Sequence, residues 1–81
     1  MDFAVDLERF AGIFEIDLES DLYLVLESTI DGRGIDEISR DHGLSKRSVH
    51  KHLSTLRYRM GVKDKRKIQE KFNKYSMNQR A

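Results

Sequence analysis

The sequence predicts an all-α protein made of five helices. Apolar residues recur at intervals of three and four along most of the chain, which is the spacing of one helix face, whereas the alternation typical of strands is nearly absent. Glycines interrupt the periodic segments, at Gly32 and Gly34, at Gly43 and at Gly61. With 81 residues, the chain is long enough for a single domain with a small core.

The composition argues against several classes of function. There is no cysteine, so neither disulfides nor thiolate zinc sites are available. No apolar run approaches the roughly 18 residues of a membrane span, and the acidic N-terminus is unlike a signal peptide. His50 and His52 are unsuited to share a metal, because residues two apart on a helix point about 200° away from each other. Since no phosphate-binding loop, nucleophile motif or acid–base pair is present either, we expect no enzyme, no cofactor and no metal.

The first helix is expected from Asp2 to Phe14, with Asp2 as a candidate cap. Its apolar residues at helical spacing are Phe3, Leu7, Phe10 and Phe14. Three phenylalanines are a large apolar load for a short helix, so another surface must cover them. Two interpretations stay open: the phenylalanines enlarge a small core, or the helix binds a partner subunit or a regulatory protein.

The second helix is expected from Leu18 to Ile30, with Asp17 as its cap. Acidic residues in its first turn suit the positive end of the helix dipole. Its main apolar stripe consists of Leu18, Leu22, Val25, Leu26 and Thr29. The segment 31–34 contains two glycines and is expected to end the helix in a turn.

A third, shorter helix is expected from Ile35 to Asp41, with Ile38 as its apolar anchor. The residues His42-Gly43-Leu44 then form a break, because glycine adopts a positive φ at no steric cost. We interpret the histidine of this break as a cap for the helix end. Ser45 is placed to cap the next helix through its hydroxyl group.

The fourth helix is expected from Lys46 to Met60. One face carries, at steps of four, three and four, Val49, Leu53, Leu56 and Met60. The opposite face carries Arg47, Lys51, Ser54 and Tyr58, with His50 and Arg57 on its flank. This division is typical of the recognition helix in a helix-turn-helix, where the apolar stripe attaches the helix to its domain and the polar face enters the major groove.

The fifth helix is expected from Lys65 to Tyr75, capped by Asp64. Ile68, Phe72 and Tyr75 lie on one face, and basic residues cover much of the remainder. Residues 76–81 are polar and are expected to form a flexible tail.

The charges of the chain are distributed unevenly. Residues 1–32 hold nine acidic residues against one basic residue, a net charge of −8. Residues 33–81 hold fourteen basic against five acidic residues, a net charge of +9, so the overall +1 hides a strongly basic half. A basic surface beside a helix-turn-helix pattern indicates nucleic-acid binding.

A set of residues between Leu18 and Phe72 follows the pattern of a known family. They are Glu37-Ile38, Leu44-Ser45, Ser48-Val49, His52, Leu56, Arg59-Met60 and Val62. In these residues the chain resembles the LuxR/GerE-type helix-turn-helix DNA-binding domain, in particular the small stand-alone GerE-like regulators. The resemblance implies a four-helix domain, here with an additional N-terminal helix. We therefore divide the chain into an N-terminal helical extension at 1–15, the helix-turn-helix domain at 16–75 and the tail at 76–81.

The resemblance also implies roles for individual residues. The positions expected to reach base edges are His50, Lys51 and Ser54. The positions expected to meet phosphates and neighbouring bases are Lys46, Arg47 and Ser48, with Arg57 as a further contact to the DNA backbone. The family dimerises through its last helix, which makes Ile68, Phe72 and Tyr75 candidates for dimerisation.

Together these features predict a sequence-specific transcription regulator that inserts residues 46–60 into the major groove of double-stranded DNA as a homodimer. Its expected place is the bacterial cytoplasm, at the nucleoid or in a phage-infected cell, without a membrane partner. The alternative is a protein-interaction module or antagonist. It would bind a larger transcription regulator or RNA polymerase, through the acidic N-terminal helix or the last helix.

Overall fold

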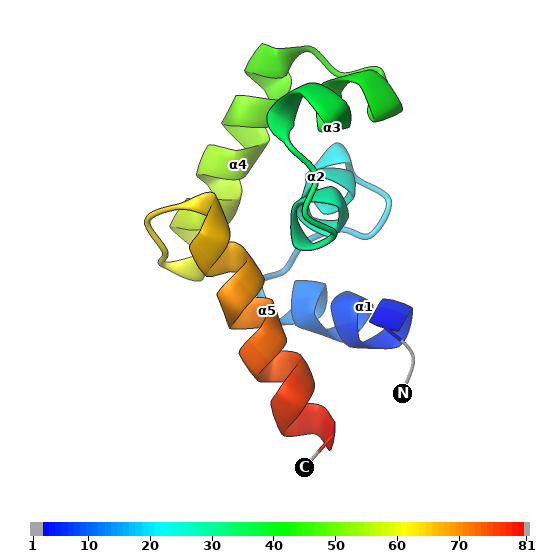
Figure 1. Ribbon diagram of the computed structural model, residues 1–81. Coiled ribbons are helices and arrows are strands. Elements are labelled where there is room, and N and C mark those ends of the chain that lie inside the picture. The colour runs from blue at the N-terminus through cyan, green and yellow to red at the C-terminus, as the bar shows by residue number, and fades with distance from the viewer. Residues whose placement is uncertain (1–2, 81) are drawn as a thin grey trace.

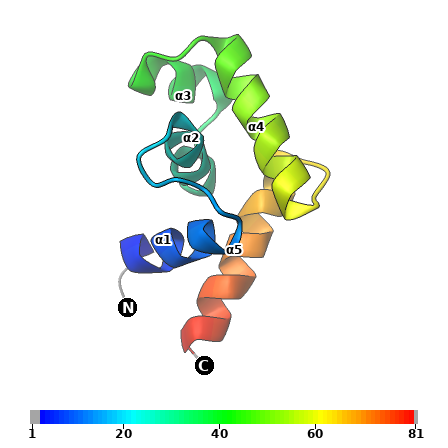
Figure 2. The same ribbon diagram turned by 180° about the vertical axis from the view of Figure 1, so that it is seen from behind.

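The computed structural model describes residues 3–80, and within this range the chain forms five α-helices (Figure 1). They are α1 (Phe3–Ile13), α2 (Asp21–Ile30), α3 (Ile35–His42), α4 (Lys46–Met60) and α5 (Lys65–Arg80). Helices α4 and α5 form an angled column, and α3, α2 and α1 are stacked along one side of it, as both views show (Figures 1 and 2). No helix among the described residues combines the length and the apolar character needed to cross a membrane.

Three of the expected helices agree closely with the structure. The bounds of α4 are confirmed at both ends, and α3 is one residue longer than expected because it includes His42. Helix α1 ends at Ile13, one residue before the expected end, while the expected cap Asp2 lies outside the described residues. The caps Ser45 and Asp64 are also confirmed, since each side chain accepts the backbone N–H three residues later, at 3.1 Å and 3.0 Å.

The expected start of the second helix is wrong. Helix α2 begins at Asp21, and its cap is Ser20, whose hydroxyl accepts the backbone N–H of Tyr23 at 3.3 Å. The carboxylate of Asp17 instead accepts the N–H of Glu19 at 2.9 Å and closes a local turn. Leu18 therefore lies in this turn with 43% of its surface exposed, and it does not belong to the apolar stripe of the helix.

The expected end of the fifth helix is also wrong, because α5 continues beyond Tyr75 to Arg80. Residues 76–80 are therefore helical rather than a flexible tail, and Ala81 lies outside the described residues. The extra turn has a tertiary partner: the Ser76 hydroxyl donates a hydrogen bond to Asp6 of α1 at 3.0 Å. A polar sequence is expected to fray only where nothing packs against it.

Helix α1 belongs to the same core as the other helices. Its Leu7, Phe10 and Ala11 are buried in one cluster with residues of α2, α3, α4 and α5. The ring of Phe10 makes edge-on contact with Phe72 of α5 at 5.3 Å between centroids, and Phe3 makes a similar contact at 5.5 Å. The first of the two interpretations of the phenylalanines is thus correct for Phe10: it enlarges the core of its own domain.

One buried group does not fit an apolar interface. Asp6 of α1 is fully buried against α5. Its Oδ2 atom accepts the hydrogen bond from Ser76, whereas Oδ1 has no hydrogen-bond partner among the described residues. A buried carboxylate without a cation destabilises the packing around it. The aromatic contacts of α1 therefore have to outweigh the cost of placing Asp6 in the interface.

The turn between α3 and α4 is held by several hydrogen bonds on one residue. The hydroxyl of Ser39 donates to the backbone carbonyl of Leu44, and the Ser39 carbonyl accepts the N–H groups of Gly43 and Leu44. Gly43 has a φ of 65°, in the left-handed region. The residue that caps α3 is therefore Gly43, and the prediction that His42 caps this helix is wrong.

Replacing Gly43 tests this turn. A Cβ atom at this position would meet nothing within 4 Å, so the cost of Gly43→Ala comes only from the left-handed backbone. We expect the free energy of unfolding to fall by about 1 kcal/mol. Gly12→Ala is the matched control, because Gly12 lies in α1 with equally open space, and it should raise stability by about 0.5 kcal/mol. Urea titrations followed by circular dichroism measure both; a stabilising Gly43→Ala would contradict the assigned backbone.

Candidate nucleic-acid interface

Helix α4 is attached to the domain through one continuous apolar face. The buried side chains on this face are Val49, Leu53, Leu56 and Met60. They pack among residues of α2, α3 and α5, so neighbours on three sides set the orientation of the helix. This is the apolar stripe that the spacing in the sequence predicted.

The opposite face of α4 is open to solvent. The exposed residues are Lys46, Arg47, His50, Lys51, Ser54 and Tyr58. Two further residues from the expected set, Ser48 and Arg57, are half-buried. Tyr58 is the most exposed large hydrophobic residue on this face, with 88% of its surface accessible. The structure thus brings all seven expected DNA-binding residues onto one helix, with five of them exposed.

Local hydrogen bonds already order part of this face. Ser48 is joined to the helix cap, since its N–H donates to the Ser45 hydroxyl and its own hydroxyl accepts from the Ser45 hydroxyl at 3.1 Å. Farther along the helix, the guanidinium of Arg57 donates to the Ser54 hydroxyl at 3.0 Å. Arg57 and Ser54 are therefore held together, and a contact of one with DNA would involve the other.

An acidic residue that no sequence pattern indicated lies beside the expected DNA contacts. The Asp36 carboxylate of α3 pairs with the Lys46 ammonium of α4 at 3.0 Å. Both side chains are largely exposed, so the pair contributes little to stability. The two residues are ten positions apart across the turn, and no periodic pattern along one helix could have revealed their contact.

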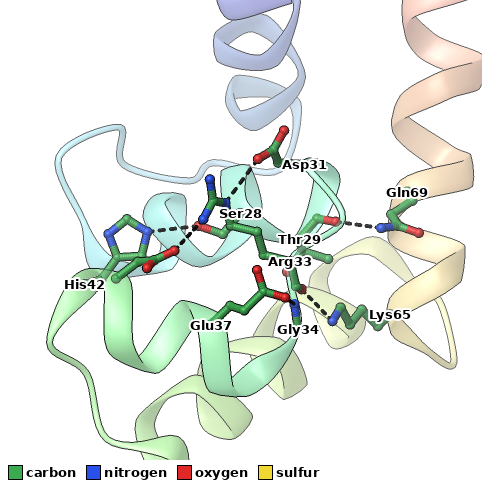
Figure 3. A network of polar contacts seen from close by, with 10 residues as sticks. Ser28, Thr29, Asp31, Arg33, Gly34, Glu37, His42, Lys65 and Gln69 are labelled. Atoms are coloured by element: carbon green, nitrogen blue, oxygen red, sulfur yellow. Dashed lines mark hydrogen bonds and ion pairs between the residues drawn. The ribbon is translucent and has the colours of Figure 1, made fainter.

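The histidines have separate surroundings. His42 contacts Ser28 of α2 through its Nε2 atom at 2.9 Å, so it links two helices instead of capping its own (Figure 3). His50 is exposed on α4, and His52 is half-buried near the apolar stripe. Among the described residues there is no group of three side chains that could hold a metal ion.

The face of α5 that was expected to dimerise is occupied within the monomer. Ile68 and Phe72 are 0% and 3% exposed, and Tyr75 is half-buried with its ring 5.5 Å from that of Phe10. Helix α1 provides much of this cover. In this conformation Ile68 and Phe72 are covered and cannot meet a second subunit, which corrects their assignment from sequence, whereas Tyr75 keeps part of its surface accessible.

Several of the basic residues of α5 and its surroundings are also engaged inside the domain. Lys65 donates to the backbone carbonyl of Arg33 at 2.7 Å (Figure 3), and Lys67 pairs with Glu70. Lys71 lies over the ring of Phe14 at 5.9 Å. These contacts tie three lysines of α5 to other residues of the domain.

A short helix, a turn with a left-handed glycine and a second helix with an outward basic face define the class of helix-turn-helix DNA-binding domains. Comparison with protein families agrees and is more specific. The family described as "bacterial regulatory proteins, luxR family" matches residues 23–73, which is more than half of the chain. The chain belongs to this family, whose members are regulators and not enzymes. No curated protein and no solved structure matched the chain.

Proposed function

We propose that this protein regulates transcription by binding specific sites on double-stranded DNA, with α4 inserted into the major groove. The observation that carries this proposal is the exposed basic face of α4 directly opposite its buried stripe. In this arrangement Lys51, His50 and Ser54 read base edges, while Lys46, Arg47, Ser48 and Arg57 contact phosphates and neighbouring bases. Such a regulator acts in the bacterial cytoplasm, on the nucleoid or on phage DNA.

We further propose that two copies bind a pseudo-palindromic site together. Because Ile68 and Phe72 are buried, we assign the subunit contact to the outer side of α5, where Met77 is a large apolar side chain with 71% exposure. Half-sites would then lie about one helical turn of DNA apart. Sedimentation of the complex on a selected operator tests this assignment. A single subunit per operator would contradict it.

Lys51→Ala tests base recognition by α4. We expect this change to weaken binding to an operator selected from genomic fragments by about 10- to 100-fold, because one specific base contact contributes about 1–3 kcal/mol. Binding to unrelated DNA should weaken much less, since only one of several cations is lost. Fluorescence anisotropy with both DNAs measures the ratio.

Lys74→Ala is the matched control, because Lys74 is an exposed lysine on α5 and not on α4. It should change binding to the operator and to unrelated DNA by the same small factor. Equal losses on both DNAs for Lys51→Ala would rule out base reading by that lysine.

The Asp36–Lys46 pair leads to a prediction in the opposite direction. Asp36→Asn removes a negative charge beside the start of α4 and frees Lys46 for a phosphate group. We expect the affinity for the operator and for unrelated DNA to rise by the same factor, about two- to fivefold. This factor corresponds to the free energy of one solvent-exposed ion pair. Glu8→Gln on α1 is the control and should leave affinity unchanged. An Asp36→Asn variant that binds more weakly would show that the carboxylate supports the interface.

The alternative of a protein-binding module receives less support from the packing of α1. Its most buried phenylalanine, Phe10, is part of the domain core and is not free for a partner. A regulatory protein would have to use the exposed side of α1, where Val5 and Ile13 are accessible. A gel shift with genomic fragments separates the two functions, since a pure interaction module would retain no DNA.

A further inference from the structure

A cavity of about 580 Å³ opens on the side of the domain between α1, α2 and α3. Its volume lies within the range of small-molecule sites. Its lining comes from three helices and the turn after α2, and consists of Phe3, Glu27, Ser28, Asp31, Arg33, Asp41 and His42. None of these residues belongs to α4, so this cavity is separate from the proposed DNA contacts.

Polar contacts between elements hold the walls of the cavity in place. The hydrogen bond between Ser28 and His42, at 2.9 Å, joins α2 to α3 (Figure 3). Arg33 donates from Nε to Asp31 at 3.1 Å and from Nη1 to Asp41. The hydrogen bond with Asp31, and then the charge of Asp41, raise the pKa of Arg33 above its ordinary value. The guanidinium is thus a fixed cation, and two carboxylates already surround it.

The charge of the lining residues favours a ligand of positive charge. Three carboxylates face one guanidinium, and that guanidinium is already shared by Asp31 and Asp41. The carboxylate of Glu27 is exposed and has no hydrogen-bond or ion-pair partner among the described residues of the chain, while its backbone carbonyl accepts the N–H of Asp31 at 3.0 Å. An anion would meet uncompensated negative charge, whereas a cation would give Glu27 the partner it lacks.

An aromatic ring completes the lining. Phe3 of α1 is 47% exposed and borders the cavity. Its ring also contacts the ring of Phe72. A ligand with an apolar group would cover this ring and remove apolar surface from water. Aromatic faces also attract cations, so both parts of such a ligand would find complementary surroundings.

We propose that this cavity binds a small organic cation, an amine or guanidine that carries an apolar group, with its charge at Glu27 and its apolar part on Phe3. The ligand would contact α2 through Glu27 and α1 through Phe3, so it would connect these two helices across the cavity. This site is independent of the proposed function, because binding can be measured on the free chain without DNA.

The test is a titration of the ¹⁵N-labelled chain with 2-phenylethylammonium, monitored by NMR. The expected result is saturable shift changes at the backbone amides of Glu27, Ser28 and His42, with none of comparable size for phenylacetate, which has the same ring and the opposite charge. Glu27→Gln should weaken the binding by about three- to fivefold, the value of one exposed ion pair. Glu19→Gln, a change of an exposed acid outside the cavity, should have no effect.

Three results would overturn the proposal. They are the absence of saturable shifts at these amides with the ammonium compound, equal shifts with phenylacetate, and an equal loss of affinity in the Glu19→Gln and Glu27→Gln variants. Operator binding should be measured with the same preparation, because this distinguishes failure of the cavity proposal from failure of the proposed DNA-binding function. A chain that binds DNA but not the cation contradicts only the cavity proposal.

Discussion

Phe10→Ala is expected to lower the free energy of unfolding by about 3–5 kcal/mol, the usual cost of truncating a buried phenylalanine. Phe10 is almost fully buried, and its ring lies 5.1 Å from Phe14, 5.3 Å from Phe72 and 5.5 Å from Tyr75. A domain of this size has a total stability near the lower end of about 5–15 kcal/mol. The variant should therefore be partly unfolded at room temperature, as thermal and urea denaturation followed by circular dichroism would show.

The importance of this result lies in what it says about α1. If α1 is part of one cooperative core, Phe10→Ala destabilises the whole chain in a single transition. If α1 is an appended helix, the variant loses α1 alone, and the remaining domain melts near the temperature of the parent. Asp6→Asn is the control on the same helix: it removes an unpaired buried charge while keeping the shape, so it should be at least as stable as the parent.

The second large effect is expected in the salt dependence of DNA binding. If Lys46, Arg47 and Arg57 each neutralise one phosphate, the slope of log affinity against log salt is about −2.7 for each bound subunit. Raising the salt concentration fourfold would then weaken binding about 40-fold per subunit. Anisotropy titrations at several salt concentrations measure this slope, and a dimer should show about twice the value.

Two controls make the salt experiment decisive. Circular dichroism of the free chain over the same salt range should stay constant, which separates loss of binding from loss of fold. Arg47→Ala should reduce the slope by about 0.9 per subunit if this residue contacts a phosphate group. A slope near zero for the parent chain would exclude binding through the phosphate backbone and, with it, the proposed orientation of α4.

Helix α1 gives this chain a feature beyond the matched family segment. The match begins at residue 23, whereas α1 ends at Ile13, and yet α1 supplies three residues to the common core. It also covers the face of α5 on which Ile68 and Phe72 lie. A dimer through Ile68 and Phe72 would therefore have to displace α1. For this reason the stability of α1 and the oligomeric state should be measured on the same variants.

Local signals were enough to locate the helix-turn-helix from sequence. The spacing of the apolar residues in α4, the serine cap at Ser45 and the left-handed glycine at Gly43 act within a few residues of one another. Their physical basis is backbone geometry and hydrogen bonding along a single helix. The bounds of α4 and the exposure of Lys51 and Arg47 could be predicted for the same reason.

Two helix ends were predicted less well, the start of α2 and the end of α5. Asp17 and Ser20 are both suitable caps, and sequence offers no means to choose between them, but the structure uses Ser20. The last turn of α5 is polar in sequence, and its helical state goes together with the contact between Ser76 and Asp6, seventy positions apart. The end of α5 is thus a boundary at which a residue distant along the chain takes part.

The sequence by itself determined the five helices apart from the start of α2 and the end of α5, the apolar side of most of them, and that one helix carries an outward row of cations. Only the tertiary structure decided how those faces are used. Helix α1 takes the α5 face that includes Phe72, Asp36 pairs with Lys46, and residues of α1, α2 and α3 line an open cavity beside Glu27. The reason is that periodicity and capping follow from hydrogen bonds within one segment. Pairing of faces depends on which segments meet in space, and one-dimensional patterns do not contain that information.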